Sequence, residues 1–137
     1  MKRLFSIGII IGLLLPLCLH AQKQRSASMD AHIVLKAAEV MPEPIGGYES
    51  FDRYLQENIR YPLQALENKV EGYVFVRFVV REDGYLVEPV ITKGLGYGCD
   101  EEVLRVIKNA PPWKPGREGT QLVPVEMTIA VLFRLPR

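Results

Sequence analysis

Two segments of this chain alternate apolar residues with a period of two, and they constrain the fold more than any other feature. Between Val70 and Arg81 the alternating set that is wholly apolar consists of Val74, Val76, Phe78 and Val80. Between Gln121 and Leu135 every second residue from Val123 to Phe133 is apolar. This period is that of a strand with one face on a core. We therefore predict two long strands, each with one buried face.

A hairpin follows the first of these strands. Residues 82–84, Glu-Asp-Gly, supply turn chemistry, and Tyr85 to Lys93 returns as the partner strand. Pro89 lies inside this second strand and has no N–H group to donate to a ladder. We therefore expect the second strand to lie at an edge of the sheet.

Helical spacing precedes and follows the hairpin. We expect a helix capped by Ser50 and ending near Arg60, with an apolar stripe of Phe51, Tyr54, Leu55 and Ile59. Pro62 suits the first turn of a short helix from Leu63 to Asn68, whose buried side is Ala65 and Leu66. A third helix, capped by Cys99 or Asp100 and ended by Pro111-Pro112, has the inward positions Val103, Leu104, Ile107 and Ala110.

The order helix, strand, strand, helix, strand predicts an α+β fold with a three-stranded antiparallel or mixed sheet. A right-handed crossover through the last helix places the third strand parallel to the second and beside the first. The predicted sheet order is 2-1-3, with the two main helices on one face. The last strand then has an open edge.

The N-terminus has the order of a secretory signal: Lys2 and Arg3, an apolar run over residues 4–19, and Ala21 before a polar residue. Sixteen helical residues reach about 24 Å, which is short of a hydrocarbon core of about 30 Å. We predict export with cleavage after Ala21; the alternative is an uncleaved inner-membrane anchor through residues 4–19. Residues 22–43 then form a tether, and residues 44–137 form one domain.

The composition excludes several classes of function. Seventeen Lys and Arg residues balance 16 Asp and Glu residues, so there is no electrostatic case for nucleic-acid binding. His20 belongs to the signal and His32 to the tether, which leaves the domain without a histidine for base catalysis or a usual zinc site. Cys18 leaves with the signal, so Cys99 has no disulfide partner.

Cys99 is the one candidate nucleophile. At the start of a helix its pKa is expected to be depressed, but it has no histidine partner. The glycines before it, Gly94, Gly96 and Gly98, do not have the spacing of a phosphate-binding loop. We predict no enzymatic activity, no metal and no cofactor, and we expect Trp113 to plug one end of the core.

The open edge of the last strand is the best physical route to a function. An unpaired edge presents backbone donors and acceptors to which an extended peptide can be added. The partner-binding residues expected on this strand are Val123, Val125, Met127, Ile129 and Val131. Proline at Met127 or Ile129 is expected to abolish peptide binding by removing a ladder donor. The alternative is an edge covered by the tether or by a second copy in a homodimer.

Four ordered motifs resemble the C-terminal domain of TonB: Tyr61-Pro62, the strand that begins Glu71-Gly72-Tyr73, Asp83-Gly84, and Trp113-Lys114-Pro115-Gly116. The resemblance covers roughly residues 44–135. It implies a periplasmic energy transducer whose last strand receives the TonB box of an outer-membrane receptor. It also implies that Asn58, Ile59 and Arg60 lie near that peptide.

The resemblance leaves two functions open. If the N-terminus is retained, it implies coupling to inner-membrane motor proteins of the ExbB/ExbD type and a role in transmembrane transport. Full-length transducers of this family cross the periplasm on a long proline-rich stretch, which residues 22–43 lack. The alternative is a soluble periplasmic interaction or structural module of the same fold, not coupled to the proton motive force.

Overall fold

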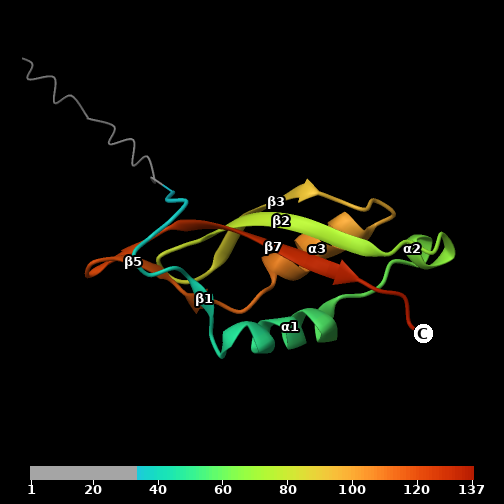
Figure 1. The fold of residues 1–137 in the computed structure, drawn as a ribbon, viewed down its shortest axis with the longest axis horizontal. Coiled ribbons are helices and arrows are strands. Elements are labelled where there is room, and N and C mark those ends of the chain that lie inside the picture. The colour runs from blue at the N-terminus through green and yellow to red at the C-terminus, as the bar shows by residue number, and fades with distance from the viewer. Residues whose placement is uncertain (1–33) are drawn as a thin grey trace, which may run out of the picture. The chain divides into compact units, whose positions relative to one another are not determined.

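The computed structural model of this chain describes residues 34–137 (Figure 1). The predicted signal, the first part of the tether and His32 lie outside the described residues. The elements in chain order are β1 (Glu43–Pro44), α1 (Gly47–Asn58), α2 (Leu63–Glu67), β2 (Gly72–Val80), β3 (Leu86–Lys93), α3 (Cys99–Lys108), β4 (Trp113–Lys114), β5 (Gly116–Glu118), β6 (Gln121–Val123) and β7 (Val125–Phe133).

The main sheet has the predicted order. Its strands follow β3-β2-β7, and β2 pairs antiparallel with both neighbours, which makes β3 and β7 parallel to each other. The pairing of β2 with β7 runs without interruption from Gly72↔Phe133 to Val80↔Val125. β3 carries Pro89 and forms one edge, as expected from the missing donor. β7 forms the other edge.

Both main helices cover one face of this sheet (Figure 1). The four alternating apolar residues of β2 named above are completely buried against Phe51 and Leu55 of α1 and Ile107 of α3. The Tyr54 hydroxyl donates a hydrogen bond to the Val106 carbonyl at 2.9 Å and joins the two helices. The predicted buried face of the first strand is therefore confirmed.

Trp113 closes one end of the core, as predicted, and is only 2% exposed. Its ring meets the rings of Phe51 and Phe78 edge to face, with centroids 5.0 and 5.4 Å apart. A third ring, that of Tyr48, lies 6.1 Å away in the same arrangement. Such edge-to-face pairs add stability beyond the area that they bury.

The predicted starts of the two main helices are wrong, whereas the short helix α2 begins at Leu63 as predicted. α1 begins at Gly47 with Gly46 as its N-cap, and α3 begins at Cys99 with Gly98 as its N-cap. Both caps have left-handed backbone angles, φ 84° and φ 86°, and neither makes a side-chain capping bond. Glycine reaches this region without a steric cost, so the chain enters each helix through a glycine turn. Ser50 therefore lies inside α1.

Two predicted burial positions also differ. On α3, Val106 is buried, whereas Leu104 is only half-buried. On α2, Ala65 is completely buried, but Leu66 is 37% exposed. The Val106 carbonyl accepts a hydrogen bond from Tyr54 of α1, so this part of α3 lies against a second helix.

The segment Gln121–Leu135 is not one strand. Pro124 divides it into β6, which pairs with β5 in a separate two-stranded sheet, and β7. Val123 pairs with Gly116 in that small sheet and does not belong to the main sheet. Pro124 itself belongs to neither strand.

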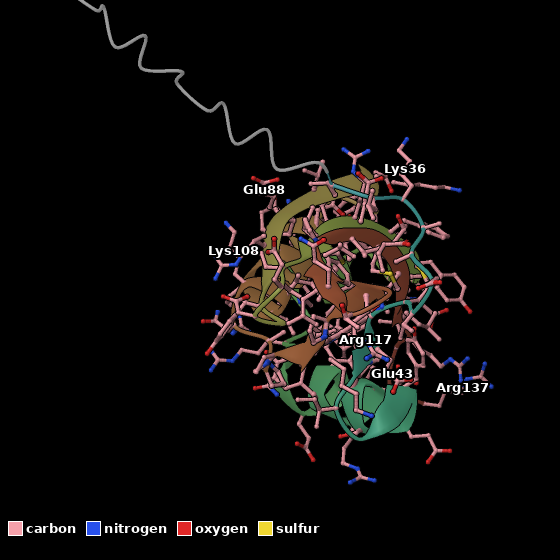
Figure 2. All side chains as sticks on the ribbon, turned by 90° about the vertical axis from the view of Figure 1, so that its left-hand side faces the viewer. Lys36, Glu43, Glu88, Lys108, Arg117 and Arg137 are labelled. Carbon is pink, nitrogen blue, oxygen red and sulfur yellow. The ribbon has the colours of Figure 1, made fainter. Side chains whose placement is uncertain are left out.

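Residues 34–44, which we name the strap, lie against the domain. Leu35 bridges to Val125 at the start of β7, and Val40 bridges to Arg117 of β5. β1 then pairs with β4, where the Lys114 ammonium lies 2.9 Å from the Glu43 carboxylate. Figure 2 shows Lys36, which belongs to the strap, pointing away from the body of the domain.

Candidate functional site

The outer edge of β7 carries backbone groups that the main sheet does not use. At the start of the strand the Leu35 N–H donates to the Pro124 carbonyl at 3.0 Å, and the Glu126 N–H donates to the Leu35 carbonyl at 2.8 Å. Residues 124 and 126 therefore direct their backbone groups away from β2. Because the pairing of β2 and β7 has no bulge, the alternation continues along the strand. The outward residues beyond the strap are Thr128, Ala130 and Leu132.

The side chains of β7 alternate between the two faces of the sheet. Val125, Val131 and Phe133 are buried on the helical face, and Met127 and Ile129 pack against the same core. Thr128, Ala130 and Leu132 are exposed on the opposite face. The residues with outward backbone groups are thus also those with exposed side chains.

A groove of about 440 Å³ runs between α1 and the second half of β7. Figure 1 shows α1, in green, and the end of β7, in red, the elements that supply most of the groove's lining residues. Its lining residues come from α1, from the connection after it and from β7: Asp52, Leu55, Gln56, Ile59, Tyr61 and residues 130–134. The groove therefore lies directly beside the open part of the β7 edge.

Of the three residues expected near a peptide before Tyr61, one lines this groove. Ile59 lies on the groove, half-buried against the core. The backbone at Asn58 and Arg60 is held to α3: the Asn58 carbonyl accepts from the Arg105 guanidinium at 2.7 Å, and the Arg60 N–H donates to the Glu102 carboxylate at 2.7 Å. These bonds hold Ile59 in its place beside β7.

The Glu102 carboxylate is the centre of this support. Its hydrogen bonds with the Arg105 side chain, at 2.6 and 3.0 Å, hold the pKa of Glu102 below its usual 4.5, although burial opposes the shift. A carboxyl group whose pKa is lower in the folded state stabilises the protein at pH values above its unfolded-state pKa. This stabilisation is lost as the pH falls through its folded-state pKa.

Glu102→Gln is therefore expected to lower the free energy of unfolding by about 1–2 kcal/mol near pH 7, and by less at an acidic pH, as the wild-type carboxyl becomes protonated. Denaturant titrations of both proteins at the two pH values measure the difference. Glu101→Gln, one residue away and exposed, is the matched control. An equal loss at both pH values would show that the charge of Glu102 does not act in this way.

The five residues predicted on the last strand lie in four different environments. Val123 is in the small sheet, and Val125 is buried beneath the bridge to Leu35. Met127 and Ile129 face the core, and only Val131 lines the groove. The structure thus brings Ile59 and Val131 together out of the predicted set.

The sequence-based prediction followed the apolar residues of the strand. It therefore did not identify Thr128, Ala130 and Leu132 as the residues whose backbone groups form the open edge. The position of Pro124 carries the missing signal, because a proline without a donor belongs on an outward-facing position of an edge strand. The proline positions chosen from sequence are therefore wrong as edge probes. Met127 and Ile129 bond to β2, so proline there disturbs the main sheet.

Cys99 does not have the environment of a nucleophile. Its side chain is completely buried. Burial, together with the negative charges of Asp100 and Glu101, raises the pKa of the Cys99 thiol, so the depressed pKa expected from its place at a helix start is wrong. Within residues 34–137 no group of acidic, histidine or cysteine side chains is arranged to hold a metal ion. The same residues contain no helix long and apolar enough to span a membrane.

The chain is similar to known proteins of one family. The family model described as "Gram-negative bacterial TonB protein C-terminal" matches residues 57–135. The TonB C-terminal domain of Pseudomonas aeruginosa is 22% identical, with a TM-score of 0.48, over 58% of this chain and 80% of that one. That of Helicobacter pylori is also 22% identical, with a TM-score of 0.43, over 61% of this chain and 89% of that one. No curated protein matches the chain. Because the family model spans more than half of its residues, this chain belongs to the TonB C-terminal domain family.

Proposed function

We propose that this chain is an exported, TonB-like domain of the cell envelope that binds a peptide segment of an outer-membrane receptor, the TonB box, as a fourth strand on β7. The observation that carries the proposal is the row of outward backbone groups on Thr128, Ala130 and Leu132. Through this contact the domain supports energy-dependent transport across the outer membrane. It carries out no bond chemistry.

An unprotected strand edge supports this proposal on physical grounds. Natural proteins usually cover a long edge or use it to pair with another chain. Peptide addition at such an edge takes affinity from main-chain hydrogen bonds and selectivity from alternate side chains. Beyond Glu126 no other strand of the described residues pairs with the outer side of β7.

The strap supports the same use of the edge. Leu35 is an extended residue that already pairs with the outward groups at the start of β7. The alternative in which the tether covers the edge therefore holds only at the first residues of β7. An added peptide would begin its pairing where the strap leaves the strand, at Thr128.

The strap also favours a second candidate, a periplasmic binding module that is not coupled to the proton motive force. Its bridges at Leu35 and Val40 hold residues 34–44 against the domain. Unless these bridges open, the residues do not lengthen the distance that the tether can span between an N-terminal anchor and the domain. Coupling to motor proteins of the ExbB/ExbD type would require an anchor such as residues 4–19. Isolation of the chain from its native envelope, with the N-terminal mass measured in each membrane fraction, separates the two candidates.

Titration with synthetic peptides from the periplasmic ends of outer-membrane receptors tests the binding itself. For a peptide that binds, two versions are made in which alternate amides are N-methylated, in the even or in the odd frame. We expect one frame to lose binding and the other to keep it, because an added strand uses only every second residue toward β7. Calorimetry with the domain measures both.

Equal affinity for both N-methylated versions would contradict strand addition, since a side-chain interaction does not distinguish the two frames of backbone donors. A receptor peptide of scrambled sequence controls for nonspecific binding. Loss of binding in both frames would indicate that the peptide does not bind as a regular strand.

A further inference from the structure

We propose that the first part of the strap is a displaceable arm that shortens the open edge of β7 and competes with a long peptide for the start of this strand. We name residues 34–38 the arm and residues 39–44 the latch. The inference rests on the proposed function, because the arm occupies the same edge to which a peptide is added. It goes beyond that function by making a contact within the chain control how much of the edge a partner reaches.

The latch is attached firmly to the small sheet. The Val40 N–H donates to the Arg117 carbonyl at 3.0 Å, and the Arg117 N–H donates to the Val40 carbonyl at 2.9 Å. The Glu39 N–H donates to the Glu118 carboxylate at 3.0 Å, and the Glu39 carboxylate accepts from the Gly119 N–H. Figure 1 shows the strap, in cyan, passing beside β5. Two consecutive residues of the latch thus take part in all of these hydrogen bonds.

Close packing adds to the attachment of the latch. Pro42 is completely buried. A Cβ atom at Gly116 of β5 would lie 3.2 Å from the Val40 carbonyl oxygen and 3.3 Å from Cδ of Pro42. It would also lie only 2.6 Å from a methyl group of Val125. Glycine at position 116 therefore lets the latch lie directly against the domain.

The arm has far fewer contacts than the latch. Its hydrogen bonds to β7 and the residue before it are the two that Leu35 makes, with the Pro124 carbonyl and the Glu126 N–H. Lys36 and Ala37 are exposed, and neither has a backbone hydrogen bond to another described residue. The arm is therefore held to the edge at a single residue.

The packing of the arm is also loose. Val34 is only half-buried, and it borders an open cavity of about 310 Å³ together with Val79, Val87 and Pro124. Atoms that border an unfilled space lose the dispersion contacts that close packing provides. The arm can therefore leave the sheet at a lower cost in free energy than the latch can.

Opening of the arm lengthens the edge that is available to a partner. Release of Leu35 frees the Pro124 carbonyl and the Glu126 N–H, while the latch stays bound. A peptide of about five residues spans positions 128–132, and one of about nine residues spans positions 124–132. A long peptide therefore has to displace Leu35, and a short one does not. The apparent affinity for the long peptide is reduced in proportion to the fraction of molecules whose arm is open.

Leu35→Pro tests this competition, because proline removes the N–H group that bonds to Pro124. The probe is the tightest-binding peptide from the receptor titrations, in a short version of about five residues and in two versions extended by about four residues at either end. We expect the version whose extension meets the arm to bind Leu35→Pro about five- to tenfold more tightly than the wild type. The short version should bind both proteins equally. Lys36→Ala, exposed and next in the chain, is the control and should bind every version like the wild type.

Hydrogen exchange without peptide tests the arm independently of its partner. The Glu126 N–H bonds to Leu35 of the arm, whereas the Arg117 N–H bonds to Val40 of the latch. After correction for intrinsic rates, we expect the Glu126 amide of the wild type to exchange at least about tenfold faster, because the arm opens while the latch stays bound. Leu35→Pro should accelerate exchange at Glu126 further and leave Arg117 unchanged.

The outcomes separate this inference from the proposed function. Equal protection of the two amides would overturn the displaceable arm, whether or not peptides bind. Equal affinities of wild type and Leu35→Pro for both extended versions would overturn the competition and leave edge binding intact. Failure of every receptor peptide to bind would overturn the proposed function and the competition together, and the exchange rates would still decide whether the arm opens.

Discussion

Trp113→Ala is expected to lower the free energy of unfolding by about 3–5 kcal/mol. The indole is 2% exposed and lies against the rings of Phe51 and Phe78, which belong to α1 and β2. Truncation removes this buried area and leaves a cavity that the sheet and the helix cannot both close. A loss of this size is comparable with the whole stability of a small domain.

Denaturant titration followed by circular dichroism measures this loss. Tyr48→Ala is the matched control: Tyr48 also meets the indole edge to face, but it is 53% exposed. We expect the control to lose about 1 kcal/mol. Equal and small losses in both variants would show that Trp113 does not close the core as described.

Ala130→Pro is expected to abolish peptide binding while the domain stays folded. The Ala130 N–H points to the open edge, so proline removes a donor that the main sheet does not use. Proline is tolerated at such outward-facing positions of edge strands. We expect a cost in stability of about 1 kcal/mol or less.

Ile129→Pro, one residue away, is the matched variant that we expect to lose stability. Its N–H bonds to β2, and its side chain packs on the core, so proline there should cost about 2–4 kcal/mol of stability. Calorimetric titration combined with thermal unfolding separates loss of binding from loss of folding. A folded Ala130→Pro variant that still binds would contradict strand addition at this edge.

The main sheet could be predicted from sequence because its signals are local. Alternation in residues 70–81 identified the central strand, Pro89 placed its neighbour at an edge, and the helical spacing before Pro111 required a crossover. The resulting order is the observed one. Trp113, between prolines, likewise lies where expected, at the end of the core.

The sequence could assign the site to the last strand, but not to particular backbone groups on it. The outward set of backbone groups depends on the register of β7 with β2 and on the bridge to Leu35, and both join residues far apart in the chain. The groove depends on how α1 lies beside β7, for which the sequence has no local signal. The apolar residues of the strand were therefore assigned to partner binding, although most of them face the core.

Hydrogen exchange at the amides of Thr128, Ala130 and Leu132 tests the central claim most directly. If a receptor peptide is added to β7 as a fourth strand, these amides become hydrogen-bonded, and their exchange slows when the peptide binds. The inward amides of Met127 and Ile129 already bond to β2 and serve as the internal control. Bound peptide without slower exchange at the outward amides would contradict binding at the β7 edge.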